Sequence, residues 1–176
     1  MLATGVYVIV FRVLHIMAAV AWGGAVYLFV VYVQPSAAAI APAGAPLIRH
    51  LLGPRRMVEG ILTLAGITIV AGAFLYWHDW RAAGSFGDWV GSSYGLWLTI
   101  GAIAAILAAA IGATVTRPNV RRMLALGDQV ARGGGTPTPE QGREMAAIQA
   151  RLKAAGRTSL ALLAVAAFAM STARYW

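Results

Sequence analysis

The apolar run from Val6 to Val33 is the feature that most constrains this chain. It is long enough to cross a lipid bilayer as a helix, which needs roughly 20 apolar residues. One arginine, Arg12, and one histidine, His15, lie in its first half. Because ionisable groups inside a bilayer are costly, these two side chains are the first candidates for a functional site.

The remaining composition agrees with a membrane protein. Of the 176 residues, 60% are hydrophobic and 11% are charged, whereas soluble domains carry about 25% charged residues. Three more apolar runs follow, at about 57–77, 94–115 and 158–173. Since lipid offers the backbone no hydrogen-bond partner, each run is expected to be a helix. The sequence therefore predicts an all-α protein, a single four-helix transmembrane bundle over residues 1–176.

The charges of the loops predict the orientation in the membrane. The first and third loops carry an excess of arginine and lysine, which is typical of cytoplasmic loops, and the second is slightly acidic. We therefore expect a multi-pass protein of the bacterial cytoplasmic (inner) membrane with both termini outside. This explains the net charge of +8 without nucleic acid as a partner. The aromatic residues expected at the outer interface are Trp77, Trp80, Trp89, Tyr94, Trp97, Tyr175 and Trp176.

The third loop is predicted to extend two helices beyond the membrane. Helix signals continue from the third span to about residue 131, and Gly133 to Gly135 break them. The segment Thr138-Pro139-Glu140-Gln141 is typical of a new helix start, with a threonine cap and a proline at the first position. We expect a cytoplasmic helical hairpin that extends the third and fourth helices and exposes its charged residues to water.

Small residues in the third span indicate its neighbour. They recur at spacings of three and four: Gly101, Ala104, Ala105, Ala108, Ala109, Gly112 and Ala113. Such residues let helix backbones approach closely in lipid, so we expect a tight pair with the alanine-rich fourth span.

The first loop, Gln34 to Pro54, contains four prolines and is expected to be irregular or only briefly helical. Directly after it, Glu59 begins the second span. Its expected role is a local ion pair with Arg55 and Arg56 at the membrane surface, and a proton-relay role is the less favoured alternative.

Arg12, His15, Ala19 and Trp22 recur at spacings of three and four, so they share one face of the first helix. Neutral imidazole is a common axial ligand of haem iron, which makes His15 the candidate metal ligand. Arg12, one turn nearer the outer surface, is placed to pair with a haem propionate. Trp22 would wall the apolar part of the macrocycle. Together the three residues predict half of a b-type haem site.

A second axial ligand would have to come from another helix at the depth of His15. His78, at the outer end of the second span, and Met170, in the outer part of the fourth, both qualify. His50 belongs to the cytoplasmic loop, across the bilayer from His15. A five-coordinate iron is also open.

The pattern Leu14-His15-Ile16, followed by Trp22-Gly23-Gly24, resembles the first helix of several bacterial membrane families. In the HemJ-type protoporphyrinogen oxidases, which bind b-type haem, a similar basic residue stands three before the histidine, as Arg12 does here. An aromatic residue follows the glycine there, as Tyr27 does here. The CopD-like copper-resistance proteins and the membrane domain of the PuuD-type urate oxidases show a similar pattern. The resemblance implies haem binding and, for an enzyme, a HemJ-like membrane oxidoreductase.

Two hypotheses of different classes follow. The first is a membrane-embedded b-type haem protein for electron transfer or haem handling, with quinone or a membrane protein as redox partner. The alternative is a cofactor-free membrane subunit or transport component that docks a partner protein in a homo- or hetero-oligomer. In that case His15 hydrogen-bonds a neighbouring helix, Arg12 reaches the headgroups and Trp22 packs in the core. The chain has no cysteine, so thiolate chemistry is excluded.

Overall fold

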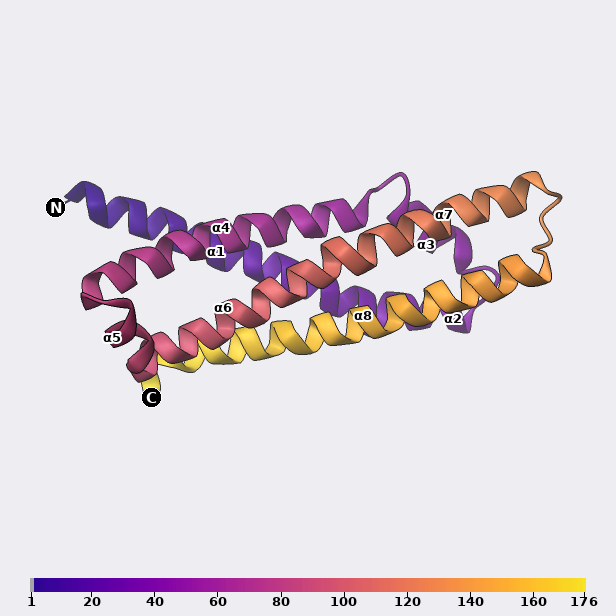
Figure 1. The fold of residues 1–176 in the computed structure, drawn as a ribbon. Helices are drawn as coiled ribbons and strands as arrows, with labels where there is room; N and C mark the ends of the chain where they lie inside the picture. Colours follow the sequence, from indigo (N-terminus) through magenta and orange to yellow (C-terminus); the bar gives the residue numbers. More distant parts are fainter. Residues whose placement is uncertain (1) are drawn as a thin grey trace.

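The computed structural model describes residues 2–176, and these residues form one bundle of long helices (Figure 1). Within this part of the chain all regular elements are helical and no strand occurs. Four helical segments are long and apolar enough to cross a membrane, namely Gly5–Ala39, Met57–Ala83, Ser93–Arg132 and Pro139–Tyr175. The prediction of an all-α bundle with four apolar helices is confirmed.

Two of the four segments contain a π-helical turn just before a proline. The first segment consists of α1 (Leu2–Leu28), the turn η1 (Phe29–Val33) and α2 (Gln34–Ala39). The third consists of α6 (Ser93–Ile111), the turn η2 (Gly112–Thr116) and α7 (Arg117–Arg132). Pro35 and Pro118 cannot donate to the carbonyl four residues earlier, and each ring crowds that carbonyl. Both carbonyls lie inside the π turns, so the prolines explain why the helices widen there.

The connections agree with the expected turn chemistry. The first loop contains only the brief helices α2 and α3 (Ala45–Leu52), as its prolines predict. Gly134 and Gly135 adopt φ angles of +99° and +84°, which end the third segment. The helix α8 (Pro139–Thr172) then begins with the predicted cap, since the Thr138 hydroxyl accepts from the backbone N–H of Gln141. The Gln141 side chain accepts the Thr138 N–H in return.

The third and fourth helical segments are longer than a bilayer requires. The 34 residues of α8 span about 51 Å at about 1.5 Å per residue, whereas the hydrocarbon core is about 30 Å thick. Its first half therefore stands beyond the membrane, beside α7. Arg122 Nε donates to Glu144 Oε1 across this hairpin at 2.6 Å, and Leu126 and Ile148 are buried in the described fold. The predicted extension of both helices is confirmed.

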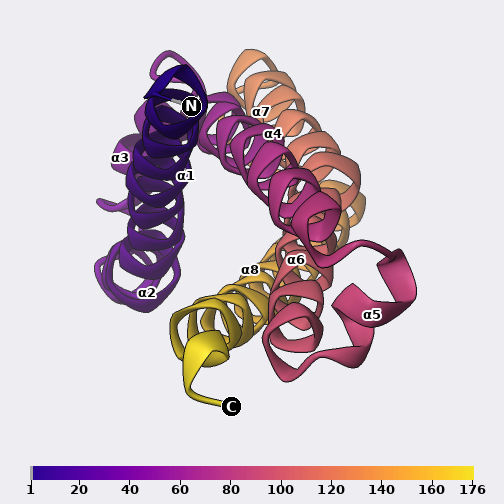
Figure 2. The same ribbon diagram turned by 90° about the vertical axis from the view of Figure 1, so that its left-hand side faces the viewer.

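Small side chains bring α6 and α8 together along their length, as the sequence predicts. A Cβ atom added at Gly101 would lie 2.8 Å from Met170 Cγ and 3.3 Å from the carbonyl oxygen of Ala166. The helices α1 and α4 (Met57–Ala83) form the other pair. Seen from one end, α1, α4, α6 and α8 follow one another around the bundle axis (Figure 2). The core between them is mostly alanine, and its members around Trp22 are Ala65, Ala104, Ala105, Ala108 and Ala166.

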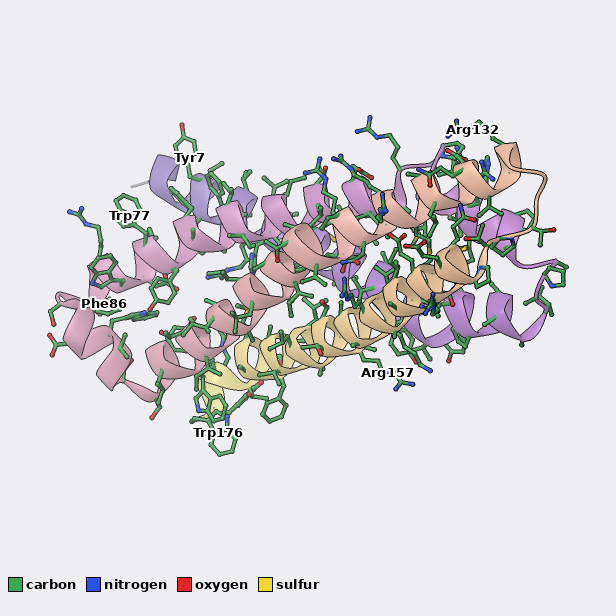
Figure 3. All side chains as sticks on the ribbon, turned by 45° about the vertical axis from the view of Figure 1, so that its right-hand side comes forward. Tyr7, Trp77, Phe86, Arg132, Arg157 and Trp176 are labelled. Atoms are coloured by element: carbon green, nitrogen blue, oxygen red, sulfur yellow. The ribbon has the colours of Figure 1, made fainter. Side chains whose placement is uncertain are left out.

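The two ends of the bundle differ in chemistry. Trp77, Phe86 and Trp176 lie at one end, and Arg132 lies at the tip of the hairpin at the other (Figure 3). At the aromatic end, Trp97 stacks on Trp176 with ring centroids 5.7 Å apart. Trp89, on the short helix α5 (Phe86–Gly91), is buried against Tyr76 and Tyr94. This ring therefore packs between helices, whereas the sequence predicted it in the aromatic belt at the headgroups.

The pairing of α6 with α8 predicts a specific loss of stability. Gly101→Leu places a side chain where Met170 and Ala166 leave no room, and such overpacking typically costs about 1–3 kcal/mol. Gly66→Leu is the matched control, because no atom lies within 4 Å of a Cβ at that mid-helix glycine. We expect thermal unfolding in detergent micelles to begin at a lower temperature for the Gly101 variant only. Equal effects of the two variants would contradict the close packing.

Candidate functional site

The imidazole of His15 is held by a contact between α1 and α4. Its Nδ1 atom lies 2.8 Å from the backbone carbonyl oxygen of Thr68. Because a carbonyl can only accept, Nδ1 carries the proton and donates it. The other ring nitrogen, Nε2, is then the basic one. Among the side chains that the structure describes, residues 5–176, none forms a hydrogen bond with Nε2.

The second helix is built to receive this ring. A Cβ atom at Gly72 would lie 2.7 Å from His15 Cε1 and 2.8 Å from Nδ1, so only glycine permits the approach. Thr68 is 4% exposed, and its hydroxyl donates to the Leu64 carbonyl at 2.9 Å. Ala65, Thr68 and Gly72 are spaced by three and four residues, so they form a strip of small residues on one helix face.

The sequence interpretation found His15 but missed Thr68 and Gly72. The signal available for them was the small-residue strip itself, because small residues at these spacings indicate where a neighbouring helix comes close. The strip does not predict which residue of the neighbouring helix packs against it. That depends on the relative position of α1 and α4, which the structure supplies.

Arg12 lies near His15 on α1 and forms no hydrogen bond or ion pair with the described residues of α4. Three residues earlier in a helix means about 4.5 Å along the axis and about 60° around it. The Arg12 side chain is exposed and forms no ion pair with any described residue.

Trp22 fills the centre of the bundle. It is 4% exposed and is surrounded by alanines of α4, α6 and α8. Gly23 and Gly24 next to it are open, since no atom lies within 4 Å of a Cβ at either position. The glycines thus leave room on the surface of α1, while the indole itself is used for packing.

The two candidate second ligands lie elsewhere in the structure. His78 is six residues beyond Gly72 on α4, or about 9 Å along the axis, and its Nδ1 is 3.1 Å from Asp79 Oδ1. Phe11 and Phe74 stack between this level and His15, with ring centroids 4.0 Å apart. Met170 packs on Gly101 between α6 and α8. No hydrogen bond among the described residues joins either side chain to His15.

The opposite end of the bundle holds a second group of charges. Glu59 Oε1 accepts from Arg121 Nη2 at 3.3 Å and lies 3.8 Å from Arg117 Nε. The expected local pair with Arg55 and Arg56 was therefore wrong, because within the described residues both ion pairs come from the start of α7. A periodic extension of the third span could not predict this, since η2 interrupts the helix just before Arg117.

No protein-family model matches this chain, and neither a curated protein nor a solved structure is similar to it. In the described part of the chain, no group of three or more histidine, aspartate and glutamate side chains is placed to hold a metal ion. The candidate site therefore consists of His15, its support from Thr68 and Gly72, and Arg12 beside it.

The fit of His15 against Gly72 can be tested directly. In Gly72→Ala the new methyl group overlaps the imidazole, so the Nδ1–H bond to the Thr68 carbonyl should be lost, at a cost of about 1–3 kcal/mol. We expect the ¹⁵N signals of the His15 ring to show a fixed Nδ1–H tautomer in the wild type and a mixture in the variant. Gly66→Ala, which meets no neighbour within 4 Å, should leave these signals unchanged. An unchanged ring in Gly72→Ala would contradict the contact.

Proposed function

We propose that this chain binds b-type haem through Nε2 of His15 and serves in electron transfer or haem handling. The observation that carries the proposal is the hydrogen bond from His15 Nδ1–H to the Thr68 carbonyl. Histidines that ligate metals almost always donate their other ring N–H to a carbonyl or carboxylate, which fixes the tautomer and the ring orientation. His15 is held in this way with Nε2 as its basic nitrogen.

The surrounding residues fit a haem in two further respects. Arg12 lies one turn from His15 toward the aromatic end and has no ion-pair partner among the described residues, so its guanidinium is available for a propionate. Gly23, about two turns deeper on α1 than His15, leaves open space on the helix surface, since no atom lies within 4 Å of its Cβ position. Bound haem would supply one-electron iron chemistry, while His15 would hold the iron and Arg12 would orient a propionate.

The contacts of Trp22, His78 and Met170 limit which residues we propose as haem ligands. Trp22 is committed to core packing, and His78 and Met170 form separate contacts with Asp79 and Gly101. His15 is therefore the one residue that we propose would hold the iron. The likeness of the first helix to the HemJ-type proteins supports the same cofactor.

The proposal includes an orientation. Since arginine and lysine gather in the first and third loops, we place the hairpin end in the cytoplasm and both termini outside the inner membrane. His15 then lies toward the outer leaflet, where quinone or a membrane redox partner would exchange electrons with the haem.

A cofactor-free alternative is supported by a different observation. The side of α1 away from the bundle exposes many large apolar residues, among them Val6, Ile9, Val13, Met17 and Val20. Such a face suits lipid or another membrane protein. In this alternative the His15–Thr68 bond only fastens α1 to α4, and the chain acts as a subunit of an oligomer.

The absorbance spectrum separates the two functions. We expect protein purified from haem-sufficient cells to show a Soret band, and His15→Ala to abolish it. Arg12→Gln should weaken haem binding roughly tenfold to a hundredfold, the size of one charge-assisted hydrogen bond. His78→Ala is the matched control, because that imidazole contacts Asp79 and not His15, and it should keep the band.

A colourless preparation that takes up no added haem would contradict the proposal. A Soret band that survives in His15→Ala would overturn the assignment of the ligand. Loss of the band in Gly72→Ala, with folding intact by circular dichroism, would further tie haem binding to the orientation of the His15 ring.

A further inference from the structure

We infer that Arg56, Arg117 and Arg121, gathered around Glu59 at the hairpin end of the bundle, bind the phosphodiester headgroup of an anionic phospholipid. This site lies at the opposite end of the transmembrane helices from Arg12 and does not depend on the proposed haem. It rests on the charge balance, the exposure and the position of these four side chains.

The charges around Glu59 do not balance. Arg121 Nη2 donates to Glu59 Oε1 at 3.3 Å, and Arg117 Nε lies 3.8 Å from the same oxygen. Arg56, directly before α4, also acts on the Glu59 carboxylate through its charge. Two guanidinium groups therefore lie within 4 Å of one carboxylate and the charge of a third acts on it from further away, which leaves a surplus of two positive charges.

The other ion pairs between described residues at this end carry no such surplus. Arg49 pairs with Asp128, and Arg122 pairs with Glu144. In each of these pairs one arginine meets one carboxylate, so the charges cancel. An anion that approaches the hairpin end gains most where the cations outnumber the carboxylates.

One donor in the cluster lacks a partner. The Nε atom of Arg117 is buried and forms no hydrogen bond with any described residue, since its separation from Glu59 is too long for one. A buried polar group without a partner is costly, typically by about 1–3 kcal/mol. The rest of the Arg117 side chain is 43% exposed and that of Arg121 is 59% exposed, so a ligand from outside can reach both.

The position of the cluster identifies the ligand as a lipid. Glu59 is in the first turn of α4, and one turn deeper Leu62 packs on Gly112, with its Cδ2 atom 3.1 Å from a Cβ at that glycine. The arginines thus stand where the apolar helices begin, which is the level of the phosphates. Basic sites between transmembrane helices at this level bind anionic headgroups. Gly60, beside Glu59, leaves open space for one, as no atom lies within 4 Å of its Cβ position.

The test is lipid binding by the full-length protein in detergent. Phosphatidylglycerol and phosphatidylcholine with the same acyl chains are titrated, and the bound lipid is counted by native mass spectrometry. We expect phosphatidylglycerol to bind more tightly to the wild type. Replacing both Arg117 and Arg121 with glutamine should weaken it roughly 25-fold, or about fivefold for each arginine near the membrane surface.

A matched control removes the same charge at a distance. Arg132→Gln together with Arg143→Gln changes the hairpin tip, where Arg132 lies (Figure 3). Arg132 is eleven residues beyond Arg121 on α7, or about 16 Å along the helix axis. This pair should bind phosphatidylglycerol as the wild type does. If it weakens binding as much as the Arg117 and Arg121 pair, the effect is one of net charge and the proposed site is wrong.

Two further experiments test the proposal if the variant with Arg117→Gln and Arg121→Gln does not fold. Glu59→Gln removes the competing carboxylate, so it should bind phosphatidylglycerol more tightly, whereas weaker or unchanged binding would mean that the cluster is only structural. Inorganic phosphate at the lipid concentration should not displace phosphatidylglycerol. Displacement by free phosphate would overturn the assignment to a lipid.

Discussion

The close approach of helices through small side chains is the constraint on which the rest of this structure depends. In lipid, apolar helices gain nothing by leaving the solvent, so they associate through van der Waals contact and interhelical hydrogen bonds. Alanines of α4, α6 and α8 line the centre, and Trp22 is the large side chain that fills it. Glycine occurs where a large side chain of another helix must be accommodated, as Gly101 does for Met170 and Gly72 does for His15.

The same constraint shapes the candidate site. Without Gly72 the imidazole of His15 could not reach the Thr68 carbonyl, and without that carbonyl its tautomer would be free. The contact serves packing and ligation equally well, because it uses only Nδ1. The two functional hypotheses therefore differ in whether Nε2 of His15 binds iron. Absorbance and ¹⁵N spectra of variants at His15 and Gly72 separate them, whereas a change in the stability of the protein would fit both.

The sequence predicted what depends on local chemistry. The apolar runs gave the membrane-crossing helices, Thr138 and Pro139 marked the start of α8, and the small residues of the third span identified its partner. It also singled out His15 as the imidazole inside the membrane. The contacts that it missed are all between helices. Thr68 as the partner of His15 and the burial of Trp89 against Tyr76 depend on how one helix is placed against another, which hydrophobic periodicity does not encode.

The partners of Glu59 show the physical reason most clearly. Arg117 and Arg121 follow η2, where Pro118 removes a backbone donor and widens the helix. A π turn contains an additional residue, so every side chain after it is rotated relative to a regular helix. The periodicity of α6 therefore cannot be extended into α7, and a local partner such as Arg56 is the natural but incorrect expectation. Pro118 lies between Arg117 and Arg121, so the helix irregularity it causes falls within the charged cluster at this end, whereas the site at His15 depends on the contact between two regular helices.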